Sequence, residues 1–357
     1  MRRSLLPLAA LIVASALPAR ASSWGEIWRS ESASARTSVA GRARTRILMG
    51  ERVQEAVAEV LAAGGKARLD YQTERRRWSL LDDGRSLIRL DPGRRVAVVL
   101  PRPPLAVDRS LAERNYVARV AGESQVAGRP TRIFEVSPRH GGAVVFRLWL
   151  DRDTGFALKR ERYNVEGKLT SGTEYLQITF GAQVPPDAFS IPPDWRQVDL
   201  DGSGERLTLA ELSRRVGFPV LEPTYLPPGY VLQGGSVQRR GRHGFEAAEL
   251  RYTDGLRLLS VSQAVPGAVL PGGFDEGRGR GPDRGRRGGR EHRRGRGGER
   301  GRGLGLGPPG GDAVTLLDRG SEKVVRHFTR DRIIIVVGDL ASDDLVKIAT
   351  SGFRETK

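Results

Sequence analysis

The chain contains no cysteine in 357 residues, and this absence excludes several chemistries. Disulfides, thiolate metal ligands and a lipid-modified amino-terminal cysteine all require a sulfhydryl group. Stability must therefore come from the packing of apolar side chains. The chain is long enough for two domains, each with its own core.

Histidine is also scarce, and the four residues His140, His243, His292 and His327 are dispersed. They form no i, i+4 pair, and no serine lies in a G-x-S-x-G turn, so neither a metal site nor a serine triad is predicted. A G-x-G-x-x-G pattern at 305–310 lacks the preceding strand and following helix that a nucleotide loop needs. We expect a protein that is not an enzyme and has no cofactor.

No apolar run reaches the roughly 20 residues that span a bilayer. The longest, Leu5 to Leu17, follows Arg2 and Arg3 and precedes the A-x-A sequence Ala19-Arg20-Ala21. This pattern predicts a signal peptide over residues 1–21 and a soluble mature protein in the periplasm. Both the general and the twin-arginine export routes stay open.

Residues 22–199 are predicted to form one domain of mostly antiparallel strands. Turn sequences such as Asp82-Asp83-Gly84 and Asp91-Pro92-Gly93 separate short apolar segments at a spacing of about ten residues, which is typical of an antiparallel sheet or barrel. Helices are expected near Trp24–Ser34 and Val107–Arg114. The expected strands between and after them lie at 66–73, 78–81, 86–90, 95–100, 116–123 and 131–136.

The clearest pattern lies between Ala143 and Phe180. Apolar residues alternate at period two, a polar turn ends on Gly155, and a second turn follows at Glu166-Gly167-Lys168. Three antiparallel strands joined as a meander are predicted.

The segment from Val53 to Ala62 carries conflicting signals. Val53, Val57, Val60 and Leu61 have helical spacing, whereas the short turn at Gly50-Glu51 suits a hairpin. On the residues alone a helix is narrowly favoured.

A linker is expected at 200–206, followed by a small α+β domain over 207–357. Thr208 is a predicted N-cap for a helix that Gly217 ends, and Ser342 is a predicted N-cap for the last helix. The run Ile333–Val337 is apolar on both faces, so we expect a central strand there.

A low-complexity insertion at 271–311 interrupts this second domain. It holds 17 glycines and 11 arginines against five acidic residues, so about +6 of the formal net charge of +17 lies here, and we expect disorder. A solvated insertion without function is one interpretation. The other is binding of an anionic envelope polymer through Arg286, Arg287, Arg293 and Arg294; no nucleic-acid partner is expected.

The apolar face of the curved first sheet is the candidate ligand site. Its predicted lining is Phe146, Leu148, Leu150, Leu176, Ile178 and Phe180. A half-barrel leaves room there for an acyl chain or an apolar peptide. The alternative is that the same residues are core beneath a helix.

Several motifs resemble a known family. Gly64 to Tyr71, the Asp83-Gly84 turn, Asp91-Pro92, and Arg147 to Asp151 with Thr154-Gly155 are similar to the lipoprotein-carrier (LolA-like) half-barrel. The branch they resemble is that of the RseB/MucB periplasmic regulators of the sigma-E response. The carboxy-terminal motifs that support this branch are Leu226 to Tyr230, Tyr252 to Leu256, Ser260 to Ser262 and Ile335 to Asp339.

The resemblance implies an α+β fold: a LolA-like half-barrel sheet with helical cover, then a small α+β domain. It also implies a strand at Val53–Ala62, in place of the helix. Its functional implication is an envelope-stress sensor that binds an inner-membrane anti-sigma factor through the small domain and lipid or lipopolysaccharide through the large one, with no catalytic residues. A lipoprotein or lipid carrier and a polyanion-binding protein are the alternatives.

Overall fold

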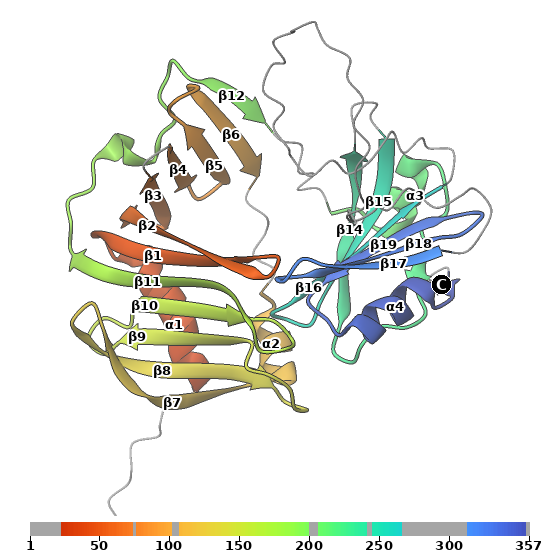
Figure 1. The fold of residues 1–357 in the computed structure, drawn as a ribbon, viewed down its shortest axis with the longest axis horizontal. Helices are drawn as coiled ribbons and strands as arrows, with labels where there is room; N and C mark the ends of the chain where they lie inside the picture. Colours follow the sequence, from red (N-terminus) through yellow and green to blue (C-terminus); the bar gives the residue numbers. More distant parts are fainter. Residues whose placement is uncertain are drawn as a thin grey trace, which may run out of the picture.

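The computed structural model describes residues 23–73, 76–101, 107–199, 206–240, 245–265 and 313–354. These residues form two large sheets, of twelve and six strands, that lie side by side (Figure 1), and a third sheet of two strands. The predicted signal peptide, the insertion at 271–311 and nearly all of the linker at 200–206 lie outside the described residues. Within the described ranges, no helix is long and apolar enough to cross a membrane.

The large sheet has the strand order β12-β6-β5-β4-β3-β2-β1-β11-β10-β9-β8-β7, and all neighbours are antiparallel except β12 and β6. The meander expected between Ala143 and Phe180 is confirmed as β9, β10 and β11. The elements are α1 (Ser23–Arg36), β1 (Val39–Met49), β2 (Arg52–Ala63), β3 (Lys66–Gln72), β4 (Arg77–Asp82), β5 (Ser86–Asp91), β6 (Val96–Pro101), α2 (Arg109–Asn115), β7 (Tyr116–Val126), β8 (Arg129–Pro138), β9 (Phe146–Asp151), β10 (Ala157–Tyr163), β11 (Leu169–Phe180), η1 (Pro186–Phe189) and β12 (Arg196–Asp199).

Helix α1 covers part of one face of this sheet. Its Ile27 is buried with Phe134 and Leu148, and its Glu26 accepts from Arg132 at 2.7 Å. We call the face that α1 covers the inner face and the opposite one the outer face. The curved sheet with its helical cover is the LolA-like half-barrel that the sequence led us to expect (Figure 1).

The outer face carries a ladder of charges that crosses the sheet from β7 to β2. Each link joins neighbouring strands or neighbours on one strand. Several members are largely buried, since the Glu135, Glu161 and Lys159 side chains are 8%, 12% and 19% exposed. In order, the links are Arg119–Glu135 at 2.7 Å, Glu135–Arg147 at 2.6 Å, Arg147–Tyr163 at 3.4 Å, Tyr163–Glu161, Glu161–Lys159 at 3.1 Å, Lys159–Glu174 at 3.6 Å, and Glu55 with Arg44 at 2.9 Å and Arg46 at 3.0 Å.

The helix favoured for Val53–Ala62 from its residues alone is wrong, and the strand implied by the resemblance is right. The segment is β2, paired with β1 over the whole hairpin from Val39↔Ala62 to Met49↔Arg52. The turn holds only Gly50 and Glu51, and Gly50 adopts φ 62°. So short a turn returns the chain directly alongside β1, and this pairing overrides the helical spacing of the valines.

The end of the first domain contains a strand that the sequence did not suggest. β12 adds to β6 in parallel, and Ile191 and Trp195 just before it pack on the outer face against Leu81, Ile88 and Leu90. A four-residue strand preceded by two proline pairs lacks the alternation that would have predicted it.

The small sheet has the order β14-β15-β16-β19-β18-β17 and confirms Ile333–Val337 as a central strand. Its core joins α3 and α4 through Leu212, Leu345 and Ile348. The elements are α3 (Leu209–Val216), β13 (Glu222–Pro223), β14 (Val231–Arg240), β15 (Phe245–Thr253), β16 (Leu258–Ala264), β17 (Ala313–Asp318), β18 (Lys323–Phe328), β19 (Ile333–Gly338), α4 (Ser342–Thr350) and β20 (Phe353–Arg354).

One of the two predicted helix caps is confirmed. Thr208 caps α3 in a capping box with Glu211, and Gly217 ends the helix at φ 75°. Ser342 is not an N-cap: it is the first helical residue of α4, Ala341 holds the cap position, and no side chain caps the helix. Asp343 and Asp344 in the first turn supply the favourable negative charge instead.

Gly41 in β1 leaves no room for a side chain, because a Cβ there would overlap the carbonyl oxygen of Gln177 in β11. We expect Gly41→Ala to lower the free energy of unfolding by about 1–3 kcal/mol, as overpacking does. Gly172→Ala in β11 is the matched control, since its nearest neighbour would lie at 3.5 Å. Urea unfolding of both variants checks this, and equal stability would contradict it.

Candidate functional site

The six residues predicted to line the ligand site lie in β9 and β11. Leu148 and Leu150 are only 9% and 4% exposed, in the core cluster that contains Ile27 of α1, and Phe146 packs against that cluster. Ile178 and Phe180 are half-buried against a second cluster, where the Phe180 ring meets Phe156 edge to face at 5.6 Å.

Leu176 stands apart from the other five. It is the extra residue of a β-bulge, because Arg42 pairs with Gln177 whereas Ala43 pairs with Tyr175. The bulge resets the alternation of β11, so Ile178 shares the inner face with Tyr175 although the two are three residues apart.

The strand register surrounds the predicted β9 residues with arginines. Phe146 lies opposite Arg162 and Leu148 opposite Arg160, both in β10, and Leu150 lies opposite Arg132 in β8. The inner face under α1 is therefore amphipathic rather than purely apolar. The patterns within β9 and β11 did not predict this feature, because the arginines belong to the neighbouring strands β10 and β8.

Beyond the part that α1 covers, the inner face carries a row of exposed leucines that was not predicted from the sequence. Leu80, Leu87 and Leu100 are 41%, 40% and 41% exposed, and Leu87 lies directly opposite Leu100. The outer face of the same strands is covered by Ile191 and Trp195. The signal in the sequence that could have predicted the exposed leucines is that β4, β5 and β6 carry apolar residues on both faces, although only one face is covered.

Cross-strand pairs connect the leucine row with Ile178, one of the residues predicted to line the ligand site. Leu80 pairs with Leu69, Leu69 with Val60, Val60 with Gly41, and Gly41 with Ile178. Paired residues project on the same face, so one apolar track runs from β11 to β4.

Aromatic rings flank this track. Tyr71 and Trp78 stack with ring centroids 5.0 Å apart. Burial raises the pKa of Tyr175 to about 12, so its hydroxyl stays protonated at neutral pH.

The two domains touch along the ends of α2 and β10. Asn115 Nδ2 donates to the carbonyls of Gly229 at 3.1 Å and Asp254 at 2.8 Å, and the hydroxyl of Tyr116 donates to the Asp254 carboxylate. Burial, followed by the charge of Asp254, raises the pKa of Tyr116. The tyrosine is therefore a neutral donor at any physiological pH.

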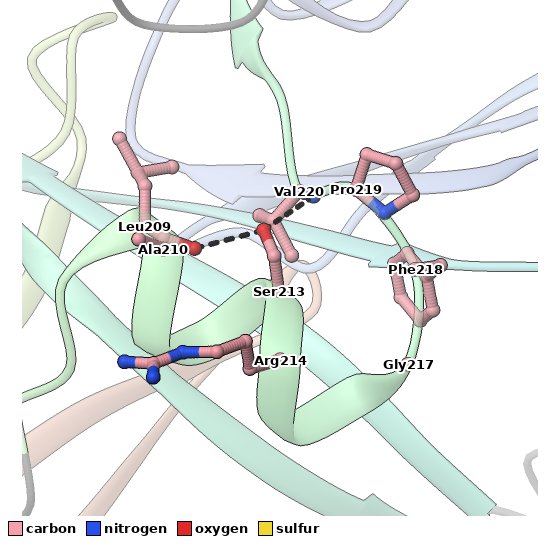
Figure 2. Close-up of a pocket in the computed structure, with 8 residues that line it drawn as sticks. All are labelled: Leu209, Ala210, Ser213, Arg214, Gly217, Phe218, Pro219 and Val220. Atoms are coloured by element: carbon pink, nitrogen blue, oxygen red, sulfur yellow. Dashed lines mark hydrogen bonds between the residues drawn. The ribbon is translucent and has the colours of Figure 1, made fainter.

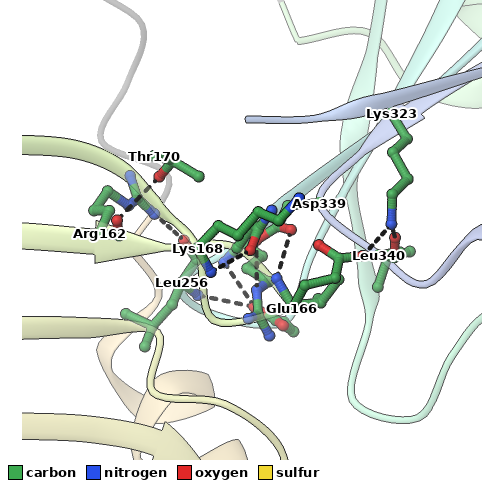
Figure 3. Close-up of polar contacts among 12 residues, drawn as sticks. Arg162, Glu166, Lys168, Thr170, Leu256, Lys323, Asp339 and Leu340 are labelled. Carbon is green, nitrogen blue, oxygen red and sulfur yellow. Dashed lines mark hydrogen bonds and ion pairs between the residues drawn. The ribbon is translucent and has the colours of Figure 1, made fainter. Parts of the chain in front are cut away.

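A second group of contacts joins the β10–β11 loop to the small sheet (Figure 3). The backbone N of Val165 donates to Asp339 at 2.9 Å, and the same carboxylate pairs with Arg257 Nε at 3.1 Å. Lys323 pairs with Glu166 and donates to the carbonyl of Leu340 at 3.2 Å. Burial raises the pKa of Asp339, opposed by the Val165 N–H and by Arg257.

A third contact is made by the tip of the β1–β2 hairpin. The backbone N of Gly50 donates to the Arg319 carbonyl at 3.2 Å. Next to it, Asn164 Nδ2 of the β10–β11 loop donates to the Gly320 carbonyl at 3.1 Å. Strands of the half-barrel that carry the inner face thus also carry the contact with the small domain.

The small domain has an open groove of about 450 Å³ beside α3, lined by Leu209, Phe218, Pro219 and Val220 among others (Figure 2). Ser213 Oγ donates to the Leu209 carbonyl at 2.8 Å and accepts from the Val220 N–H at 2.9 Å. The hydroxyl of Ser213, which lies in this groove, therefore already has hydrogen-bond partners within the chain.

Among the described residues, no three histidine, aspartate or glutamate side chains are grouped so as to hold a metal ion. Arg286, Arg287, Arg293 and Arg294 lie outside the described residues, so polyanion binding through them stays a prediction.

The architecture defines a class: a LolA-like half-barrel joined to a small α+β domain. Residues 51–193 match the family described as the MucB/RseB N-terminal domain. The match covers part of the chain, and it confirms the resemblance to RseB/MucB-type regulators expected from the sequence.

One curated relative matches part of the chain, and two solved structures share its fold. The sigma factor AlgU regulatory protein MucB of Pseudomonas aeruginosa is 33% identical over 146 residues, and the match spans 41% of this chain and 43% of that protein. MucB in complex with MucA(peri) has a similar fold, with a TM-score of 0.57, 22% identity, and coverage of 91% of this chain and 96% of that one. A Pseudomonas aeruginosa MucA/MucB complex gives a TM-score of 0.57 at 22% identity, covering 92% and 97%.

Gly255 packs directly on α2, where a Cβ would overlap the backbone N of Ala112. We expect Gly255→Ala to loosen the contact between the domains. Gly84→Ala is the matched control: both glycines have positive φ, 105° and 88°, so both variants carry a strain of about 1–2 kcal/mol, but nothing lies within 4 Å of Gly84.

Small-angle scattering and limited proteolysis of the two variants measure the loosening. A larger radius of gyration and faster cleavage are expected for Gly255→Ala alone. Identical behaviour of the two variants would show that the contact at Gly255 does not hold the domains together.

Proposed function

We propose that this protein is a non-enzymatic periplasmic regulator that binds an inner-membrane anti-sigma factor through its small domain and an apolar ligand in its half-barrel. The observation that carries the proposal is the shared two-domain fold with MucB, covering 91% of this chain, together with the 33% identity in the first domain. The related structures are complexes of MucB with MucA, which supports a partner of the same kind here.

The ligand is a lipid, a lipopolysaccharide or an apolar peptide. Support comes from the leucine row formed by Leu80, Leu87 and Leu100, which leaves apolar side chains in water on a face that elsewhere is covered by α1. Exposed apolar patches of this kind are typical of binding sites. The predicted residues of β9 and β11 continue the same face beneath the helix, so the ligand would reach them if it slid under or displaced α1.

A lipid carrier is the weaker alternative. A carrier needs only the half-barrel, whereas here the small domain is tied to it by hydrogen bonds and ion pairs from Asn115, Tyr116, Val165 and Glu166. Such a contact allows the state of one domain to bias the other, which a regulator requires.

Capture from membranes tests the partner. The mature full-length chain is immobilised, exposed to detergent extract of membranes from the source organism, and the retained proteins are identified. We expect a single-pass membrane protein with a cytoplasmic sigma-binding segment. Retention of lipoproteins or lipids alone would support the carrier and overturn the regulator.

Leu87→Lys tests the ligand face. A charge in the middle of the leucine row should lower the affinity for a neutral amphiphile such as dodecyl maltoside at least tenfold, because the apolar contact is replaced by a group that needs hydration. Leu258→Lys is the control, since that leucine is comparably exposed but lies on β16 of the small sheet. Calorimetric titration below the critical micelle concentration measures both, and equal affinities would place the ligand elsewhere.

A further inference from the structure

One edge of the small sheet lacks the protection that the other sheet edges have. β17 ends the strand order, and among the described residues only β18 pairs with it (Figure 1). Five of its six residues are exposed, and Val314, Leu316 and Leu317 are 43%, 46% and 41% exposed. An apolar edge strand of this kind presents backbone N–H and C=O groups that can pair with another strand.

The other three edges of the two large sheets carry features that oppose such pairing. β7 has a bulge after Val120 and carries the charged Arg119, and β12 has only four residues. β14 is covered near its middle, where the Leu207 N–H donates to the Gly235 carbonyl at 2.8 Å and the Gly235 N–H donates to the Leu207 carbonyl at 2.9 Å. By contrast, β17 is regular in its pairing and uncharged from Ala313 to Leu317.

The side chains of β17 indicate what kind of molecule fits this edge. Leu316 lies opposite Val325, which belongs to the core beneath α3 and α4, whereas Leu317 lies opposite Val324 and projects to the other face. An added strand would therefore meet an exposed leucine on each of its faces. An acyl chain would cover the leucines but leave the backbone groups beneath it without partners. An extended polypeptide with apolar side chains satisfies both.

The contact between the domains adjoins the end of β17. The β17–β18 turn begins where β17 ends, and Gly50 at the tip of the β1–β2 hairpin donates to the Arg319 carbonyl in that turn. On either side of this tip, Met49 and Val53 are 57% and 50% exposed. A polypeptide paired along β17 therefore has further exposed apolar surface, on the half-barrel, at the end of the strand.

A second copy of this chain is the less favourable occupant of the edge. A six-residue strand is about 20 Å long and a sheet is about 10 Å thick, so two paired β17 strands offer each other about 200 Å². Stable dimers bury about 800 Å² per partner. An extended segment of another protein is not limited to this edge, because it can wrap on to neighbouring surface such as the hairpin tip.

We propose that β17 is the docking edge for the membrane partner, and that an extended apolar segment of that partner adds to it as a further strand of the small sheet. This inference rests on the proposed function and specifies the surface that the partner uses. Strand addition supplies affinity through main-chain hydrogen bonds and specificity through alternate side chains. Because the bound segment would end beside the turn that Gly50 contacts, a movement of the β1–β2 hairpin would act directly on it.

A lysine in the edge tests the proposal. The full mature chain, Leu316→Lys and Val117→Lys are each immobilised and exposed to the membrane extract. Val117 is the matched control, since it is 40% exposed on β7, the edge strand of the large sheet. Both lysines lie in water, so both variants should keep the urea midpoint of the wild type. We expect Leu316→Lys alone to retain at least tenfold less of the single-pass membrane protein, because a charge in an edge strand opposes pairing.

Amide hydrogen exchange shows whether a strand has been added. The soluble periplasmic segment of the retained protein is bound to the full mature chain. Exchange over residues 313–318 should slow at least tenfold in the complex, while exchange over β7 should stay as in the free chain. Reduced retention by Leu316→Lys without slower exchange in β17 would mean contact without strand addition, and would overturn the proposal. Protection of β17 in the free chain, together with a doubled mass in ultracentrifugation, would assign the edge to a second copy and also overturn it.

Two further results separate this inference from the proposed function. If the wild type retains the membrane protein, but Leu316→Lys retains as much and β17 exchanges as in the free chain, the partner binds elsewhere and the proposed function stands. If the wild type retains no single-pass membrane protein, the anti-sigma part of the proposed function fails and this inference fails with it.

Discussion

The alternation of side chains in the large sheet, reset only at β-bulges such as the one at Leu176, is the constraint on which the rest of this structure depends. Because residues project to opposite faces at period two, the ladder from Arg119 to Glu55 lies on the outer face, while Leu148 and Phe134 lie beneath α1. A shift of one residue in a pairing would exchange the two faces of the strand and turn its buried apolar side chains away from the helix. The register therefore decides at once which face is in water, which is core and where a ligand has access.

The same register links the candidate ligand face to the contact between the domains. In β10, Arg160 and Arg162 lie on the inner face, and Arg162 donates to the Leu256 carbonyl of the small domain. A ligand that shifted β10 or α1 would therefore act on a strand end that the small domain also holds. This proximity would give the proposed regulator a short physical route between the candidate ligand face and the small domain.

Much of the fold followed from local patterns. The meander from Ala143 to Phe180, the capping of α3 by Thr208 and the central strand Ile333–Val337 were all predictable, because turns, caps and apolar runs are short-range signals. The helix predicted for Val53–Ala62 was wrong, because strand pairing with β1 outweighs the helical spacing of the valines. Ser342 failed as a cap by a single position. β12 was missed, because its only partner lies about a hundred residues earlier in the chain.

The candidate site was less predictable, for the same physical reason. By itself the sequence determined the strands, the lack of thiol chemistry and the resemblance to RseB/MucB regulators, since these depend on residue identity and local order. Only the tertiary structure decided that Leu148 and Leu150 are covered by α1 and that Leu80, Leu87 and Leu100 are open. The burial and the contacts of a side chain depend on which strands and helices meet across the sheet, and no single segment of the sequence determines that arrangement.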